Sequence, residues 1–411
     1  MSERVDIAII GGGIVGCSLL YCLARLGRVD SLLLEQNELT SGSTWHAAGN
    51  TTFFGHYASI TQLYVNSVRV YRDAESESGQ AIGFHDAGSV RIANTKAELD
   101  AYRILEANYA ELGIPYEVID TARLAELHPL LQTDGIIGAA HTPSDGHLDA
   151  SGATHAVAAA ARSRGARIER QTRVTGIEPH AEGWKLSTAG NEVIARDVVF
   201  ANSFWARELG QTIGIDIPVY AVKHQALVTE TIPAIAALDF ELPTIRDSHG
   251  HYNMRQEGQG LLGAVYESDP QFWALDGIPP DFNQELFEPA LDNIERDFSR
   301  VFERVPAFAE AGIRQIIHGP ICYTPDALPL LGPVAGKKGL WLATGFCVGI
   351  GTGGGAAEFL AEWMTTGKPP ADLPMVYPSR FAEVPGQAEC IDAIRGIYAR
   401  GYGVVEHGLS V

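Results

Sequence analysis

A run of glycines close to the N-terminus has the spacing that lets a protein backbone approach phosphate groups. The run reads Gly11-Gly12-Gly13-Ile14-Val15-Gly16, which satisfies GxGxxG, and Glu35 follows at about the offset of an acid that binds ribose hydroxyls. The glycines permit a tight turn, and a following helix offers unpaired N–H groups to phosphates. This combination predicts a dinucleotide site rather than a glycine turn without a ligand.

A second glycine-rich segment lies near the C-terminus. The apolar run 340–344 precedes Gly345, and more glycines stand at 349, 351 and 353–355 before a predicted helix over 356–364. A nicotinamide site has no need of this second unit. A flavin does, because its ring requires a wall and its reduced form carries negative charge that a helix N-terminus stabilises. The two segments together predict FAD.

The segment Ser41-Gly42-Ser43-Thr44-Trp45-His46-Ala47-Ala48-Gly49 consists mostly of small residues and follows the predicted ribose-binding strand. We therefore expect it to pass beneath the flavin. Its histidine, His46, could be a structural residue whose hydrogen bonds are made within the protein, a contact of the flavin, or a covalent tether through an imidazole nitrogen. The residues taken by themselves favour the first of these roles.

The elements that must position these residues begin as a βαβ unit, with a buried strand over 5–10, a helix over 14–26 and a strand over 31–35. The part from 217 to 317 is rich in strand patterns. The remaining patterns predict helices over 97–112, 121–131, 152–165 and 286–301, and strands over 166–169, 184–188 and 197–202.

These patterns predict an α/β and α+β fold. A Rossmann-like FAD-binding domain of the glutathione-reductase type carries an inserted, mostly antiparallel β-sheet substrate domain. A length of 411 residues agrees with two domains. We assign 1–88, 145–216 and 325–385 to the discontinuous FAD-binding domain, 89–144 and 217–324 to the substrate domain, and 386–411 to a C-terminal extension.

Composition excludes several classes of function. A net charge of −20 argues against nucleic acid and anionic membranes as partners. The five cysteines form no CxxC pair, so neither a zinc site nor a disulfide framework is expected. His249 and His251 lack a third ligand nearby in sequence, and no metal is predicted. No signal peptide or membrane span is apparent, and we expect a cytoplasmic protein.

The loop SGSTWHAAG resembles the flavin domain of the dimethylglycine dehydrogenase and sarcosine dehydrogenase family, and the corresponding loop of 4-methylaminobutanoate oxidase. These proteins belong to the D-amino-acid oxidase and sarcosine oxidase superfamily. Residues 222–225, 319–332 and 390–398 also resemble that family's segments. The resemblance covers nearly the whole chain, and its most specific parts are the histidine loop and Thr324-Pro325-Asp326.

The resemblance implies that His46 is bonded to the 8α-methyl group of the flavin. Together with the glycine motifs it predicts a set of residues that contact FAD. They are Gly11, Gly13, Ile14, Val15, Gly16, Glu35, Gln36, Ser43, Thr44, Trp45, His46, Ala48, Gly49, Val174, Ala201, Asn202, Trp205, Gly345, Gly349, Ile350, Gly351 and Thr352.

The resemblance also implies oxidation of an N-methylated amine or amino acid, such as dimethylglycine or sarcosine. Hydride would leave the carbon next to nitrogen for flavin N5, and the iminium would hydrolyse to the demethylated amine and formaldehyde. The amine must be neutral for this step, so the pocket should favour its deprotonated form. The candidate catalytic residues are Tyr252, Arg255, His224 and Tyr323, with Tyr252 or Arg255 as partners for a substrate carboxylate.

Several positions depart from the family's pattern. Ala226 stands where many relatives have an aromatic residue, and Ser203 where they have glycine. Leu262 occupies the approximate place of a lysine that helps monomeric sarcosine oxidase react with oxygen, which favours a dehydrogenase with an electron-carrier partner over an oxidase that uses O2. The family's dehydrogenases continue into a folate-binding half, which this sequence does not show; a separate subunit could supply folate binding, or formaldehyde could simply leave.

Two alternatives remain open from the sequence. The pyruvate dehydrogenase phosphatase regulatory subunit resembles the same family, so the chain could be a non-catalytic regulatory relative. It could also oxidise another secondary amine or a D-amino acid. The intact glycine fingerprint and His46 favour an enzyme.

Overall fold

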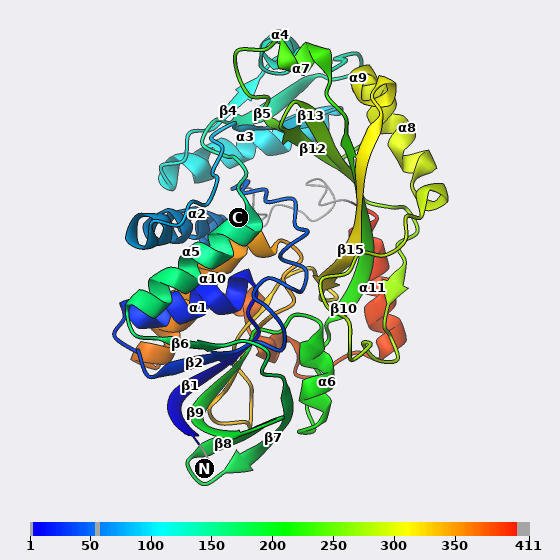
Figure 1. The fold of residues 1–411 in the computed structure, drawn as a ribbon. Helices are drawn as coiled ribbons and strands as arrows, with labels where there is room; N and C mark the ends of the chain where they lie inside the picture. Colours follow the sequence, from blue (N-terminus) through cyan, green and yellow to red (C-terminus); the bar gives the residue numbers. More distant parts are fainter. Residues whose placement is uncertain (1–2, 54–57, 401–411) are drawn as a thin grey trace.

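The computed structural model describes residues 3–53 and 58–400, which fold around two β-sheets (Figure 1). The first sheet contains β1 (Glu3–Ile10), β2 (Ser31–Leu34), β6 (Arg167–Glu169), β7 (Val174–His180), β8 (Gly183–Thr188), β9 (Glu192–Phe200), β16 (Leu330–Pro333) and β17 (Leu340–Thr344). Its order is β16-β17-β9-β1-β2-β6, and β8 joins the hairpin partner β7 to β9. Strands β17, β9, β1, β2 and β6 run parallel, so their carboxyl ends meet at one edge.

Strand β1 is buried on both faces, as its continuous apolar sequence predicts. Ile7 and Ile9 belong to the core beneath the helices, whereas Ala8 and Ile10 pack in a second core with Trp184 of the β7–β8 hairpin. Helices cover the face of the sheet on which Ile7 and Ile9 lie, as Figure 1 shows. They are α1 (Ile14–Arg25), α2 (Ala58–Ser78), α5 (Ala150–Ser163) and α10 (Gly349–Thr366).

The second sheet contains β3 (Ser89–Ala93), β4 (Glu117–Ile119), β5 (Gly138–Thr142), β10 (Tyr220–Thr229), β11 (Thr244–Asp247), β12 (Tyr252–Glu257), β13 (Gly260–Val265), β14 (Phe272–Trp273) and β15 (Ile313–Tyr323). Its order is β14-β10-β13-β12-β11-β3-β5-β4, and β15 pairs with β10. Every pair in it is antiparallel except β3 with β11. The helices associated with it are α3 (Lys96–Glu111), α4 (Thr121–Leu127), α7 (Pro233–Ala236), α8 (Glu295–Arg304) and α9 (Pro306–Glu310).

The predicted fold class is confirmed, because a parallel-centred sheet with helices stands beside a second, mostly antiparallel sheet. All strands of the first sheet fall within 1–88, 145–216 and 325–385, and all strands of the second within 89–144 and 217–324. We keep these ranges as proposed domain boundaries. The connecting elements are α6 (Trp205–Gln211), η2 (Pro374–Val376), η3 (Pro378–Phe381) and α11 (Gln387–Tyr398).

Helix α10 begins at Gly349, seven residues before the predicted start at Ala356. Its glycines lie inside the helix, where they let α2 approach closely. A Cβ added to Gly355 would lie 2.1 Å from the carbonyl oxygen of Leu63, and one added to Gly354 would lie 2.9 Å from Cα of Ser67. The glycine run is therefore a helix-packing surface as well as part of a turn.

The helix predicted over 286–301 is wrong in its bounds. A 3₁₀ turn, η1 (Leu291–Asn293), precedes α8, and the residues before it are irregular. Pro289 disfavours a helical conformation at the residue before it. The segment instead bonds to the second sheet, because Phe287 N–H donates to the carbonyl of His318 and Ala290 N–H donates to the side chain of Gln225.

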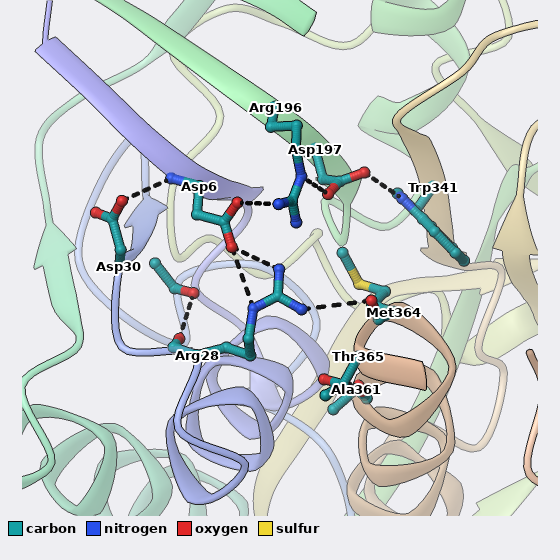
Figure 2. Close-up of polar contacts among 10 residues, drawn as sticks. Asp6, Arg28, Asp30, Arg196, Asp197, Trp341, Ala361, Met364 and Thr365 are labelled. Atoms are coloured by element: carbon teal, nitrogen blue, oxygen red, sulfur yellow. Dashed lines mark hydrogen bonds and ion pairs between the residues drawn. The ribbon is translucent and has the colours of Figure 1, made fainter. Parts of the chain in front are cut away.

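A polar cluster joins the strands and helices of the first sheet near the start of β1 (Figure 2). Arg28 donates to Asp6 and to the carbonyl of Met364 on α10, and Arg196 on β9 pairs with Asp6 at 2.7 Å. These side chains are partly exposed, so each pair stabilises the fold only slightly. Their joint effect is to fix the framework that carries the glycine turn at the other end of β1.

Candidate functional site

A cavity of about 560 Å³ is lined by residues of both sheets. The glycine turn after β1, the end of β2 and the loop over 41–52 form one part of its wall, and helix α10 contributes its first turn. Strands β10, β11, β12, β13 and β15 of the second sheet contribute the opposite part. The volume is in the range of cofactor and ligand sites.

Glu35 closes the nucleotide end of this cavity. Its carboxylate accepts the N–H of Gly12 at 2.6 Å and the N–H of Asn37 at 2.8 Å. Burial raises the pKa of Glu35, while these backbone N–H groups act in the opposite direction. The acid therefore lies against the glycine turn, where the sequence pattern predicts ribose binding.

The glycine turn is tightly packed. A Cβ on Gly16 would lie 2.0 Å from the carbonyl oxygen of Gly11, and one on Gly11, whose φ is +113°, would lie 2.5 Å from the carbonyl oxygen of Ala201. Thr44 accepts the N–H of Ile14 at the start of α1. Gly16 thus brings helix against strand, and the other glycines leave backbone open to the cavity.

His46 lies on the cavity wall beside strand β15. A Cβ on Gly319 would lie 2.6 Å from Cε1 of His46, so glycine is needed for this contact. Nε2 of His46 is buried and has no hydrogen-bond partner among the described residues. Burial lowers the pKa of His46 to about 4, so the imidazole is neutral at physiological pH.

The second sheet supplies a polar group at the other end of the cavity. The group consists of His224 on β10, Arg246 on β11, Asn253 on β12 and Tyr266, which follows β13. The guanidinium of Arg246 lies 5.7 Å from the ring centroid of Tyr266, and its Nη2 lies 3.5 Å from the tyrosine oxygen. Asn253 accepts a hydrogen bond of 3.3 Å from Asn50 of the flavin-domain loop.

Most residues predicted to contact FAD line this cavity. The lining residues among them are Gly11, Gly13, Ile14, Val15, Glu35, Gln36, Ser43, Thr44, His46, Ala48, Gly49, Val174, Ala201, Asn202, Trp205, Gly345, Gly349, Ile350 and Gly351. Gly16, Trp45 and Thr352 are not on the wall. The ring of Trp45 meets that of His46 edge-on, with centroids 5.6 Å apart, and the hydroxyl of Thr352 donates to the carbonyl of Val348, the residue before α10.

The structure fits FAD at this place. The glycine turn and the N-terminus of α10 both reach the wall, and the unpartnered Nε2 of His46 is buried beside it. Such an orphaned buried nitrogen is rare in folded proteins unless a ligand or a bond satisfies it.

Three of the four candidate catalytic residues do not line the cavity. Tyr252 is 1% exposed in the core of the second sheet with Met254, because alternate residues of a strand face opposite sides. Arg255 donates to the carbonyls of Ala48 and Gln256, so N–H groups of its guanidinium already bond to the protein backbone. Tyr323 is buried in an aromatic cluster, which leaves His224 as the one on the wall.

The sequence reasoning did not assign roles to Arg246, Asn253 or Tyr266. Arg246 and Asn253 lie close in sequence to the candidates Tyr252 and Arg255, but which face of each strand meets the cavity depends on the register of β12 with β11 and β13. Leu262 and Ala226 also line the cavity, so both departures from the family's pattern lie at this end.

A separate polar cluster joins the two sheets' loops. The carboxylate of Glu241 bonds to Nδ1 of His85 and to Nε2 of His147, both at 2.9 Å, and the two imidazoles stack with centroids 4.6 Å apart. Their donor atoms lie within 4.8 Å of one another. Because the rings are nearly parallel, one ion cannot lie in both ring planes, and this arrangement is that of a hydrogen-bonded clamp rather than a formed metal site.

All five cysteines are free thiols, and four of them are buried. No helix within residues 3–53 and 58–400 has both the length and the apolar content needed to cross a membrane.

Comparisons with known proteins agree with this geometry. The family model described as FAD dependent oxidoreductase matches residues 6–363. Mitochondrial dimethylglycine dehydrogenase of Mus musculus is 41% identical over 387 residues, which cover 93% of this chain and 44% of that protein. Mitochondrial sarcosine dehydrogenase of Homo sapiens is 31% identical over 381 residues, which cover 91% of this chain and 41% of that protein.

The chain thus spans less than half the length of these two relatives. Among solved structures, L-proline dehydrogenase from P. horikoshii has a TM-score of 0.81 at 24% identity, and the match covers 93% of this chain and 99% of that one. This likeness concerns the fold. On the match over most of its length, the chain belongs to the family of FAD dependent oxidoreductases.

Proposed function

We propose that this protein oxidises an N-methylated amine or amino acid of the dimethylglycine or sarcosine type, with release of the demethylated amine and formaldehyde. The observation that carries this proposal is one cavity that joins a dinucleotide cradle to a pocket containing Arg246 and His224. FAD, when bound, supplies the acceptor for the hydride that leaves the carbon next to nitrogen. The two named relatives, a dimethylglycine and a sarcosine dehydrogenase, support the substrate class.

Arg246 is the proposed anchor for a substrate carboxylate, in place of Arg255. Its guanidinium lies against the ring of Tyr266 on the cavity wall, whereas Arg255 does not line the cavity and bonds to the carbonyls of Ala48 and Gln256. A planar guanidinium offers paired donors that match a carboxylate. Binding there would fix the orientation of an amino acid relative to the flavin end of the cavity.

His224 is the proposed base for the substrate amine. It is the candidate histidine of the second sheet that reaches the cavity, and β10 and β15 place it opposite Gly319, against which His46 packs. A neutral imidazole can take a proton from a substrate ammonium, which leaves the nitrogen lone pair required for oxidation. Asn253 and Tyr266 complete the polar wall around it.

Covalent attachment of the flavin through His46 is the second part of the proposal. The resemblance to the family suggests the bond, and a neutral, buried imidazole with an unpartnered Nε2 on the cavity wall supports it. The bond would satisfy the nitrogen that the described residues leave without a partner.

The proposed electron acceptor is a carrier protein rather than O2. Leu262 lines the cavity, and it provides no cation to stabilise reduced oxygen near the flavin. A cytoplasmic location belongs to the same proposal, and the formaldehyde would either pass to a folate-binding partner or leave the enzyme.

Anaerobic bleaching of the bound flavin tests the substrate class. Purified yellow protein is mixed under argon with sarcosine, dimethylglycine, longer N-methyl amino acids, proline, glycine and a D-amino acid, and the absorbance of oxidised flavin is followed. We expect bleaching by N-methylated amino acids within the time of mixing. A colourless purified protein would favour the regulatory alternative, and bleaching by proline or a D-amino acid alone would replace the proposed substrate class.

A further inference from the structure

The C-terminal helix α11 brings its last residue, Tyr398, to His224, which lines the cavity. The tyrosine is 1% exposed, and its hydroxyl lies 2.5 Å from Nδ1 of His224. The same hydroxyl donates to the carboxylate of Glu267, which is itself 5% exposed. A residue outside both proposed domains thus contacts the candidate base.

The protons of this network can be assigned from its chemistry. An ionised carboxylate has only lone pairs to offer, so the Tyr398 hydroxyl proton goes to Glu267. Burial and the neighbouring Glu267 raise the pKa of Tyr398, so the phenol keeps that proton. The phenol oxygen can then only accept from His224, and Nδ1 of His224 must carry hydrogen.

This assignment fixes the other ring nitrogen as well. A neutral imidazole with hydrogen on Nδ1 has a free lone pair on Nε2. Because Nδ1 is taken up by Tyr398, Nε2 is the nitrogen of His224 that remains for the cavity. The carboxylate of Glu267 lies 3.7 Å from Nδ1, where its charge stabilises the imidazolium after proton uptake.

Few other groups around His224 could determine the protonation state of its imidazole. His46 and His318 are both kept neutral because burial lowers their pKa values. Arg246 lies against Tyr266, whose ring centroid is 5.3 Å from that of His224. Among these neighbours, Glu267 supplies the negative charge, and Tyr398 connects it to the imidazole.

We propose that Tyr398 is a positioning residue that holds His224 in the Nδ1–H form, with Nε2 directed to the amine substrate, and that couples it to the carboxylate of Glu267. The catalytic consequence of this inference rests on the proposed function. In the reaction, the ammonium N–H bond breaks, an Nε2–H bond forms, and the positive charge passes from the substrate to the imidazole. Helix α11 is then part of the active site rather than an extension.

The test uses Tyr398→Phe in the full chain with its flavin, which keeps the ring packing and removes the hydroxyl. The matched control is Tyr220→Phe, because Tyr220 is buried in the same aromatic cluster but does not share the hydrogen bond that Tyr398 makes with His224. The ¹⁵N shifts of histidine-labelled protein report the tautomer, and the signal of His224 is assigned from its absence in His224→Gln. Flavin content, kcat and KM are measured in parallel.

We expect the Nδ1–H form of His224 in the wild type and in Tyr220→Phe, and a shift towards the Nε2–H form in Tyr398→Phe. With an accepted amine substrate, kcat should fall about tenfold in Tyr398→Phe while KM and flavin content stay the same, since only part of general base catalysis is lost. An Nε2–H form in the wild type, or no change of tautomer in Tyr398→Phe, would overturn the inference. The NMR result does not depend on turnover, so failure of the proposed substrate class is seen separately.

Discussion

His46 and His224 share one cavity, but their surroundings give the two imidazoles different chemistry. Nε2 of His46 is buried without a partner among the described residues, whereas Nδ1 of His224 is bonded to Tyr398. The first is suited to a permanent bond and the second to reversible proton transfer.

Replacing His46 by alanine should convert bound FAD from acid-resistant to acid-extractable. In the wild type, yellow colour should stay with the pellet after denaturation and precipitation in acid, because the proposed bond to His46 would hold the flavin to the chain. In His46→Ala the glycine cradle should still bind FAD, and the colour should move to the supernatant. The control is His155→Ala on the exposed side of α5, which should behave as the wild type. Yellow supernatant from the wild type would refute the covalent bond.

Replacing Arg246 by glutamine should weaken the use of carboxylate substrates. Loss of a charge-assisted hydrogen bond to a carboxylate corresponds to about a tenfold to hundredfold decrease in kcat/KM. An N-methylated amine without a carboxylate provides the internal control, since its kcat/KM should not change. Equal losses for both substrates would mean that Arg246 acts on the fold and not on the carboxylate.

The residues that sequence could assign are those in local motifs. Gly11 to Gly16 form one continuous stretch, and the loop with His46 forms another. The position of each stretch in the cavity wall therefore follows from its own local sequence. At the polar end of the cavity, the lining residues depend on which alternate residues of each strand face the cavity, and the sequence alone does not determine this. Tyr252 faces the core while its neighbour Asn253 lines the cavity.

At the scale of the element, the close packing of helices depends on glycines, and the sequence pattern indicates only part of their structural role. Glycines in α1 and α10 allow contacts that a Cβ would prevent, and those in α10 were expected to form a turn ahead of the helix. Helix α11 shows a different limit. Its link to His224 joins residues 174 apart in the chain, and no local pattern reports such a contact.

Gly16→Ala and Gly396→Ala should have opposite effects, although both place alanine in a helix. At Gly16 the new methyl group would lie 2.0 Å from the carbonyl oxygen of Gly11, so the βαβ turn must open. We expect flavin content to fall at least about tenfold and Tm to decrease.

At Gly396, in α11, a Cβ meets no atom within 4 Å, and the higher helix propensity of alanine should raise the free energy of unfolding by about 1 kcal/mol. Thermal unfolding and the ratio of flavin to protein absorbance measure both. Normal flavin content in Gly16→Ala would contradict the close-packed cradle.

At the scale of the whole molecule, the cavity exists because two sheets are held against each other. Asn50 bonds to Asn253 across this junction, and Glu241 joins the imidazoles of His85 and His147. The two-sheet architecture was predictable from the change in pattern along the chain. The clamp was not, since its three residues come from segments far apart in sequence.

Glu241→Gln should destabilise the protein most at neutral pH. The hydrogen bond from His147 lowers the pKa of Glu241, so its contribution is present above the ordinary value of 4.5 and is lost as pH falls through the lowered value. We expect a loss of about 1 kcal/mol in the free energy of unfolding at pH 7, because the carboxylate is partly exposed. Urea unfolding at several pH values measures it.

The difference between wild type and Glu241→Gln should narrow as pH falls from 4.5 through the lowered pKa, because the carboxyl takes up its proton first in the unfolded chain and then in the folded one. The control is Glu182→Gln, whose carboxylate pairs with Arg4 at the exposed surface and should leave stability unchanged. A difference that grows towards acid pH would show that Glu241 does not act as an ionised clamp.

The most direct test of the proposed oxidative N-demethylation is a single turnover in the absence of oxygen and of any other acceptor. One equivalent of N-methylated amino acid is added to the yellow protein, and reduced flavin, formaldehyde and demethylated amine are quantified. We expect one formaldehyde and one demethylated amine for each flavin reduced. Flavin reduction without formaldehyde, or with loss of ammonia from the substrate, would contradict it.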